Sequence, residues 1–526
     1  MISFKENIIS IKMLTILLFS LSFSGNLYGK TTIESRPNIL FIMSDDHTSQ
    51  AWGIYDGILK DYVKVDNIKR LASEGAVLDN VFCTNSICSP SRAAILTSQY
   101  SHKNKGYTLR EPLQDGSKNI AGILRENGYE TAVIGKWHLV KEPEGFDHYN
   151  VLPGQGVYHN PVLKSKENWQ DGYKGGKKYS GFSADVITNL TIDWLSKRKE
   201  EKPFLMMTHF KATHEPFDFP QRHKDLYRNV EIPEPESLYD FSPKTTGRTF
   251  KGQKLEILGG RMVQATIDPE NFWTSYPDLP FSLDGLDSIA ARKKIYQKYV
   301  KDFMRCGAAI DDNIGRLLDY LEESGLAENT VVIYTADQGY FLGEHGFFDK
   351  RLIYEESLRM PFVIRYPKEI KGGTRINDII LNIDFPALMA DYAGVEIPDN
   401  WQGNSFRNNL MEKTPKDWRN NMYYRYWLHR TERPGHFGIR DERYKLAFFY
   451  GQPLGMKGAM KESTIPTWEF FDLKTDPKEI RNAYNNPQYA DIIQSMKNEL
   501  INLRKELGDM DEQSPVMQDI FKKHWN

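Results

Sequence analysis

Short apolar runs alternate with longer stretches of helical periodicity up to about residue 400. The apolar runs have the length of strands buried on both faces, and they lie at residues 38–43, 129–134, 204–210, 330–335 and 360–366. Helical patterns lie at residues 65–74, 120–127, 184–199 and 288–324, and three of them are followed by Gly75, Gly128 and Gly325. This alternation predicts an α/β fold with a largely parallel sheet.

The pattern changes after residue 400. Short strand patterns lie at residues 422–426, 436–439, 444–449 and 468–472, and a helical pattern covers 492–507. They predict a smaller antiparallel sheet with one helix. We therefore expect an N-terminal α/β domain at 30–400 and a C-terminal α+β subdomain at 401–526. Residues 216–286 are rich in proline, glycine and charge, which predicts a long insertion.

The first 29 residues have the pattern of an export signal. Lys5 and Lys12 precede the apolar run 13–19, and small or polar residues follow at 25–29. The apolar run is too short to span a bilayer comfortably. We expect a cleaved signal peptide at 1–29, a periplasmic or secreted protein, and no membrane span after cleavage. The alternative is an uncleaved N-terminal anchor.

Charge and cysteine content exclude several classes of protein. The 526 residues include 68 Lys and Arg against 70 Asp and Glu, a net charge of −2, so there is no general basic field for nucleic acid. Any anion-binding site must be local. The three cysteines form neither a disulfide framework nor a zinc pattern. Cys83 and Cys306 could pair or stay reduced.

Polar residues directly follow four of the predicted strands. Because the carboxyl ends of parallel strands meet at one edge of a sheet, these side chains should converge on one site. They are Asp45, Asp46, Lys136, His138, His214, Asp337 and Gln338. Each pair alone also fits a turn or a helix cap. Together, the two pairs of oxygen ligands predict a site for a hard divalent cation, and all-oxygen ligation argues against zinc.

The run Cys88-Ser89-Pro90-Ser91-Arg92 is predicted to begin a helix, because Pro90 suits a first turn and apolar residues follow. Cys88 is then at a helix N-terminus, where free N–H groups and the helix dipole favour an anion. Arg92 lies about one turn further on, on the same side, and could hold an anion bidentately. The alternative is a helix start with an ordinary thiol.

This pentapeptide resembles the formylglycine motif of the type I sulfatases, in the alkaline phosphatase superfamily. Residues 128–138 and 347–361 are similar to two further motifs of that family. The resemblance extends over residues 37–484 and is nearest to secreted bacterial carbohydrate sulfatases. It implies an alkaline-phosphatase-like fold, with a large mixed, mostly parallel sheet flanked by helices. It also implies that a formylglycine-generating or anaerobic maturation enzyme converts Cys88 to Cα-formylglycine.

The resemblance also implies roles for individual residues. Arg92, Lys136 and Lys350 contact the sulfate, His138 handles the proton of the formylglycine hydroxyl, and His214 protonates the departing alcohol. The metal ligands would be Asp45, Asp46, Asp337, Gln338 and the modified Cys88. One Ca²⁺ per chain is the leading candidate, and Mg²⁺ is the second. Many family members have Asn where Gln338 stands.

The expected function is therefore hydrolysis of sulfate esters on a sulfated poly- or oligosaccharide, which would be the substrate partner. Two alternatives stay open, a phosphonate or phosphodiester hydrolase of the same superfamily and an inactive sulfoglycan-binding protein. His345, His436 and Arg440 would either line the substrate pocket or have structural roles. The sequence does not identify the sugar or the sulfate position.

Overall fold

A large mixed sheet organises the N-terminal part of the chain. The structure, a computed structural model, describes residues 36–114, 116–240 and 250–525, so the predicted signal peptide lies outside the described residues. The strand order is β10-β2-β9-β8-β1-β7-β3-β4, and β11 also pairs with β2. Pairing is parallel except at β9, which is antiparallel to β2 and β8. The strands are β1 (Asn38–Asp45), β2 (Ala76–Phe82), β3 (Glu130–Lys136), β4 (His148–Leu152), β7 (Phe204–Thr213), β8 (Thr330–Ala336), β9 (Arg359–Arg365), β10 (Thr374–Ile376) and β11 (Ile380–Leu381).

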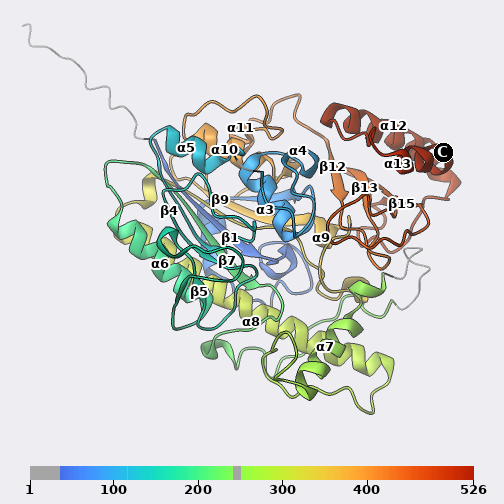
Figure 1. The fold of residues 1–526 in the computed structure, drawn as a ribbon, viewed down its shortest axis with the longest axis horizontal. Coiled ribbons are helices and arrows are strands. Elements are labelled where there is room, and N and C mark those ends of the chain that lie inside the picture. The colour runs from blue at the N-terminus through green and yellow to red at the C-terminus, as the bar shows by residue number, and fades with distance from the viewer. Residues whose placement is uncertain (1–35, 115, 241–249, 526) are drawn as a thin grey trace, which may run out of the picture. The chain divides into compact units, whose positions relative to one another are not determined.

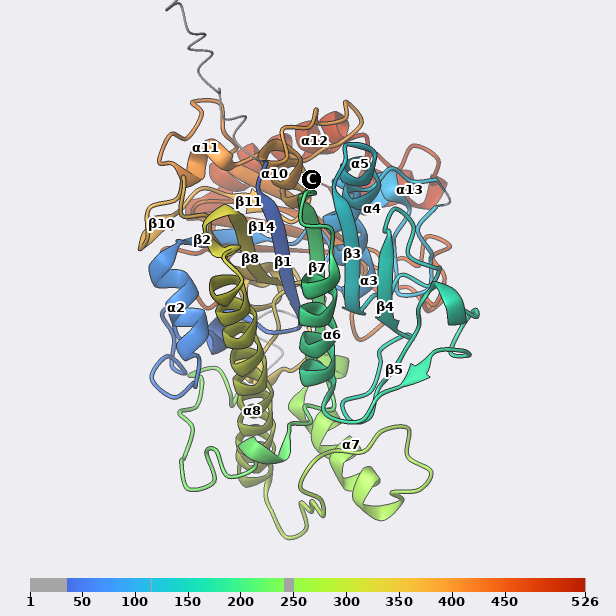
Figure 2. The same ribbon diagram turned by 90° about the vertical axis from the view of Figure 1, so that its left-hand side faces the viewer.

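Helices cover both faces of this sheet, and alternate residues of β1 point into two separate cores. Phe41 belongs to the core beneath α3, α5 and α10, whereas Ile42 belongs to the core beneath α2, α6 and α8. Figure 2 shows α6 and α8 lying across one face, with β8, β1, β7 and β3 side by side behind them. The helices are α2 (Asp66–Glu74), α3 (Cys88–Thr97), α4 (Ser101–Asn104), α5 (Ile120–Glu126), α6 (Ser183–Lys197), α7 (Leu255–Ile267), α8 (Ser288–Glu323), α9 (Glu355–Leu358), α10 (Asp384–Tyr392) and α11 (Arg407–Leu410).

A second, smaller sheet follows, as predicted (Figure 1). Its four antiparallel strands are β12 (Asn421–Tyr426), β13 (His436–Asp441), β14 (Tyr444–Phe449) and β15 (Thr467–Asp472). Helices α12 (Ala490–Leu507) and α13 (Pro515–His524) pack against them through residues such as Leu500 and Met517. The described part of the chain from Arg36 onward forms one compact unit. The boundary between residues 400 and 401 therefore stays a prediction.

Several elements have no clear signal in the sequence. Strand β2 contains Asp79 and Asn80, which interrupt its apolar run, and β10 and β11 are only three and two residues long. The short ribbon of β5 (Val162–Leu163) and β6 (Lys177–Lys178) has only two residues in each strand. The insertion at 216–286 contains α7, a helix that the composition of this segment did not predict. These elements are stabilised by tertiary contacts rather than by local pattern.

The described residues contain no disulfide bond. No helix in the described ranges is long and apolar enough to cross a bilayer. Cys83 and Cys306 are buried and unpaired with each other, and their thiols donate to the carbonyl oxygens of Ser357 and Asp218. The structure therefore keeps both as reduced thiols.

Gly135 provides a direct test of how tightly β3 and β7 are packed. Its φ is +114°, and an added Cβ would lie 1.9 Å from the carbonyl oxygen of His209 on β7. We expect Gly135→Ala to reduce the free energy of unfolding by about 3 kcal/mol or more, because neither backbone can move away freely. Chemical denaturation measures this. Gly260→Ala in α7, where nothing lies within 4 Å, is the matched control and should be neutral or stabilising.

Candidate active site

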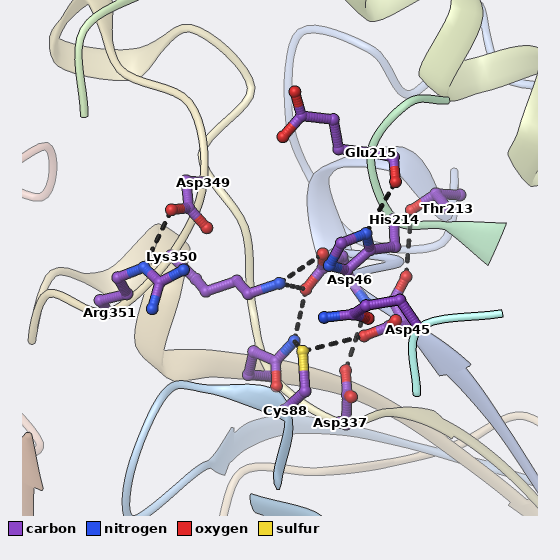
Figure 3. A network of polar contacts seen from close by, with 12 residues as sticks. Asp45, Asp46, Cys88, Thr213, His214, Glu215, Asp337, Asp349, Lys350 and Arg351 are labelled. Atoms are coloured by element: carbon purple, nitrogen blue, oxygen red, sulfur yellow. Dashed lines mark hydrogen bonds and ion pairs between the residues drawn. The ribbon is translucent and has the colours of Figure 1, made fainter. Parts of the chain in front are cut away.

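Four neighbouring parallel strands bring the polar residues together. Strands β8, β1, β7 and β3 are adjacent in the sheet, so their carboxyl ends form one continuous edge. Asp45 ends β1, Lys136 ends β3, and Asp337 and His214 directly follow β8 and β7. Figure 3 shows Asp45, Asp337 and His214 grouped around Cys88, the first residue of α3. The structure therefore brings these predicted site residues into one place.

Cys88 lies at the centre of this group. It is the first residue of α3, and its Sγ is 3.2 Å from Oδ1 of Asp45 (Figure 3). Burial raises the pKa of the thiol to about 12, since its desolvation outweighs the opposing influence of Lys350. The unmodified thiol is therefore neutral, and the expectation that this helix N-terminus favours a bound anion stays a prediction. An unmodified Cys88 would be a neutral and weak nucleophile.

The guanidinium group of Arg92 makes hydrogen bonds within the protein. Its Nε donates to Asp337 Oδ2 at 2.9 Å, and its Nη1 donates to the carbonyl oxygen of Lys136 at 2.7 Å. Its Nη2 is buried without a hydrogen-bond partner in the described part of the chain, 4.0 Å from Asp45 Oδ1. Nη2 and the second N–H of Nη1 stay available to an anion, so the bidentate contact expected of Arg92 stays a prediction.

The acidic residues form a buried cluster with the composition of a cation site. Asp45, Asp46 and Asp337 are all 0% exposed, and one oxygen of each lies within 4.8 Å of the others. Burial raises the pKa of Asp46 to about 6, with Lys350 opposing the shift. The Oε1 of Gln338 is buried and accepts no hydrogen bond from the described residues. Three adjacent carboxylates and an unused amide oxygen fit a hard divalent cation.

Two lysines pair with different members of this cluster. Lys136 pairs with Asp45 and also contacts Gln155, a residue that the sequence did not indicate. Lys350 donates to both carboxylate oxygens of Asp46 at 2.6 Å (Figure 3). Burial opposes the charge on Lys350, but the surrounding carboxylates raise its pKa above the ordinary value. Lys350 is therefore a cation at the edge of the acidic cluster. Burial, followed by the charge of Lys211, lowers the pKa of Lys136 well below its ordinary value, and Lys136 is held there by its close pairing with Asp45.

The two histidines are neutral in this environment. Burial, followed by the charge of Lys136, holds the pKa of both His138 and His214 well below 6.5. The Nδ1 of His214 lies 2.8 Å from the carbonyl oxygen of Glu215, which can only accept, so Nδ1 carries the proton. The Nε2 of His214 is then the atom that exchanges a proton. The carbonyl of His138 accepts from Ser89 Oγ at 2.7 Å, which ties it to α3.

For three further residues, pocket lining and a structural role both stay open, and Arg440 does line a cavity beside Glu355 and Glu356. His345 is 1% exposed, and neither ring nitrogen has a hydrogen-bond partner in the described part of the chain. The His436 ring stacks on Phe449 with centroids 4.5 Å apart. Arg440 pairs with Glu355 at 3.2 Å. The contacts of His436 and Arg440 fit a structural role as well.

Residues beside His214 were missed at the sequence level. Lys211, near the end of β7, is 3% exposed, and its Nζ lies 4.8 Å from the Tyr158 ring centroid. Glu215 is bound by Arg261 at 2.8 Å and fixes the backbone next to His214. The sequence did offer a signal for Lys211, because a lysine three residues before His214 can reach the same site. It offered no signal for the contact between Arg261 and Glu215, because Arg261 lies in the insertion.

Comparisons with known proteins give the same family. The family model described as Sulfatase matches residues 37–395, and the model N-sulphoglucosamine sulphohydrolase, C-terminal, matches residues 343–506. An N-acetylglucosamine-6-O-sulfatase of Bacteroides thetaiotaomicron is 38% identical over 90% of this chain and 88% of its own length. An arylsulfatase of Clostridium perfringens is 26% identical over 91% and 95%. A solved structure in complex with its substrate D-glucosamine-2-N,6-O-disulfate superimposes with a TM-score of 0.81 at 35% identity, covering 91% of this chain and 100% of the other. The chain belongs to the sulfatase family of enzymes.

Proposed function

We propose that this protein hydrolyses a sulfate ester on a sulfated carbohydrate, and that the ester is the 6-O-sulfate of a glucosamine residue. The position of Cys88 carries the reaction class: it begins α3, and its Sγ lies 3.2 Å from Asp45 inside a buried group of acids and cations. The sugar and the sulfate position are supported by the name of the 38% identical relative and by the ligand of the 35% identical structure.

Cys88 is assigned as the residue that a formylglycine-generating or anaerobic maturation enzyme converts to Cα-formylglycine. The neutral thiol supports this assignment, because an unmodified Cys88 with a pKa of about 12 would be a poor nucleophile. The hydrated aldehyde would supply an oxygen nucleophile and would allow sulfate to leave by elimination. The remaining chemistry is assigned to side chains that surround this position.

Arg92, Lys136 and Lys350 are assigned to bind the sulfate. Their positive charges are fixed before the reaction, by Asp337, Asp45 and Asp46 respectively, so little reorganisation is needed as charge develops on the sulfate oxygens. His138 is assigned to take the proton from the nucleophilic hydroxyl. His214 is assigned to protonate the departing sugar oxygen through Nε2.

A Ca²⁺ ion is the proposed cofactor, held by Asp45, Asp46, Asp337, Gln338 and the modified residue 88. Bound there, it would act as a Lewis acid at residue 88 and add positive charge to the site. The fit rests on the three clustered carboxylates and on the unpartnered Oε1 of Gln338.

A substrate panel tests the function. The mature enzyme should release sulfate from 6-O-sulfated glucosamine and N-acetylglucosamine faster than from 2-N-, 3-O- or 4-O-sulfated sugars. A phosphonate monoester and a nitrophenyl phosphate belong in the same panel. Faster cleavage of either phosphorus substrate than of every sulfate ester would assign the protein to phosphorus ester hydrolysis. Binding of sulfated glycans without turnover by fully converted enzyme would indicate a binding protein.

We also propose export to the periplasm or the medium, with removal of residues 1–29. The basis is the charged and apolar pattern of that segment. N-terminal sequencing of the mature protein tests this. A mature chain that still begins at Met1 in the cytoplasm would contradict it.

Removal of the metal should inactivate the enzyme. Thorough chelation is expected to lower kcat at least about 100-fold, and Ca²⁺ should restore activity more fully than Mg²⁺. Elemental analysis should find one ion per chain, and its loss should lower the melting temperature because the ion binds only the folded state. Unchanged activity in a preparation that contains no metal would show that the acidic cluster has been misassigned.

A further inference from the structure

Lys211 is a buried lysine without an anionic partner. Lys211 lies near the end of β7 and is 3% exposed. In the described part of the chain its ammonium group makes neither a hydrogen bond nor an ion pair. Its close contact is the face of the Tyr158 ring, 4.8 Å from Nζ to the centroid. A buried cation is costly unless a partner neutralises it. A partner that is absent from the free protein would explain its retention.

The ammonium group of Lys211 acts on the proposed catalytic residues. It is among the charges that lower the pKa of His138 and of His214, and Asp46 and Cys88 in turn favour its own charged form. Burial is the larger influence and lowers the pKa of Lys211 to about 8, which leaves it mainly charged at neutral pH. Lys211 is thus a cation close to the reacting group.

Tyr158 fixes Lys211 and His214 relative to each other. The Tyr158 hydroxyl donates to the carbonyl oxygen of His214, while its ring supports the Lys211 ammonium. Lys211 and His214 also share the end of one strand, three residues apart. A sulfate group that reaches Nε2 of His214 therefore also enters the electrostatic field of Lys211.

Unlike the other cations of the site, Lys211 forms no ion pair in the described part of the chain. Lys136 pairs with Asp45, Lys350 pairs with Asp46, and Arg92 uses two of its three nitrogens within the protein. Each of these charges is partly neutralised by an acid. The Lys211 charge is not, so an incoming anion would gain more from it.

We propose that Lys211 is a third sulfate-binding lysine, whose ammonium group binds an oxygen of the substrate's sulfate beside His214. This inference rests on the proposed sulfatase reaction. It adds to that reaction a contact which none of the family motifs quoted above contains.

Lys211→Met tests the proposal by removing the charge while keeping much of the volume. We expect kcat/KM on both a nitrophenyl sulfate and a sulfated sugar to fall about 10- to 100-fold, the usual effect of losing one charged hydrogen bond. Inhibition by inorganic sulfate should weaken by a similar factor, and Lys211→Arg should retain part of both. The melting temperature of Lys211→Met should stay equal or rise, because an unpaired buried charge is removed.

Lys164→Met is the matched control. Lys164 is also buried, at 1% exposed, and also lies over an aromatic ring, 4.6 Å from Trp169, but it donates to the carbonyl oxygens of Gln170 and Gly172. Its loss should lower the melting temperature and leave sulfate inhibition unchanged. The proposal is wrong if Lys211→Met, like the control, lowers the melting temperature and leaves sulfate inhibition unchanged. It is also wrong if Lys211→Met weakens sulfate inhibition less than about twofold, where about 10- to 100-fold is expected.

A second measurement does not depend on the variants. In a crystal structure of the wild-type protein with bound inorganic sulfate, Nζ of Lys211 should lie about 3 Å from a sulfate oxygen. A sulfate bound at Arg92 and Lys350 but out of reach of Lys211 would overturn the proposal. Turnover of nitrophenyl sulfate by the wild type separates this outcome from failure of the proposed function, because that turnover does not presuppose a role for Lys211.

Discussion

Replacement of Cys88 by alanine should lower kcat by about 10⁴-fold or more on every sulfate ester, the scale seen when a nucleophile is removed. The structure places the Cys88 side chain against Asp45 at the centre of the site, and in the described residues no other thiol lies there. Protein made in a host without the maturation enzyme should be equally inactive. Peptide mass spectrometry should show formylglycine only in the active preparation.

Cys88→Ser should fail in a different way. A serine has one hydroxyl group, so it can accept the sulfuryl group but cannot expel it by elimination. We therefore expect release of one equivalent of alcohol and a protein whose mass has increased by one sulfuryl group. Cys83→Ala is the matched control: Cys83 is also buried and free, but it donates to the carbonyl oxygen of Ser357. Full activity in enzyme whose Cys88 is an unmodified thiol would contradict the assignment.

The parts of the fold that could be predicted are those with strong local patterns. Residues 38–43 and 330–335 are continuous apolar runs, and they form β1 and β8 at the centre of the sheet, buried on both faces. Strand β2 was missed because Asp79 and Asn80 are tolerated near its edge, where β10 and β11 pair with it. Its stability comes from neighbours that are about 300 residues away in the sequence.

The position of the site was predictable for a topological reason. Polar residues at the ends of parallel strands must meet at one edge, so the closeness of Asp45 and Asp337 follows from adjacent strands β1 and β8. The partners of individual side chains were not predictable. Arg92 uses Nε and Nη1 within the protein, and nothing in its local sequence shows this. Such pairing depends on side chains brought together by the whole fold.

Charge balance links these observations. Asp45, Asp46 and Asp337 are neutralised in the protein by Lys136, Lys350 and Arg92, one cation for each acid. A bound divalent cation would shift this balance toward positive charge, and a sulfate ester would restore it. The site is therefore arranged so that binding of the metal and binding of the anion favour each other.

The neutral state of His214 has a consequence for pH dependence. Burial and the nearby lysines hold its pKa well below 6.5, so the free enzyme at pH 7 contains little of its protonated form. Since the protonated form is the general acid, kcat/KM on a sulfated sugar should rise as the pH falls toward that pKa. The same parameter on an activated aryl sulfate should not follow this trend.

Replacement of His214 by alanine should separate two classes of substrate. A sugar alkoxide is a poor leaving group and needs a proton as the S–O bond breaks, so we expect a loss of about 10²- to 10⁴-fold in kcat/KM on a native-type sulfated sugar. A nitrophenolate leaves without a proton, and the loss there should be much smaller. The geometry supports this role, because the backbone carbonyl oxygen of Glu215 accepts a hydrogen bond from Nδ1 at 2.8 Å and leaves Nε2 for the substrate.

His138→Ala is the matched comparison, since His138 is also a half-buried, neutral histidine just after a neighbouring strand. Its proposed proton transfer at residue 88 is common to both substrates, so its loss should lower kcat on both by similar factors. KM alone cannot separate the two roles, because it also depends on how tightly the substrate binds in the ground state. If His214→Ala loses the same factor on the sugar and on the aryl sulfate, its general-acid role is wrong. Its contribution would then be to bind the sulfate itself, beside Lys350 and Lys136.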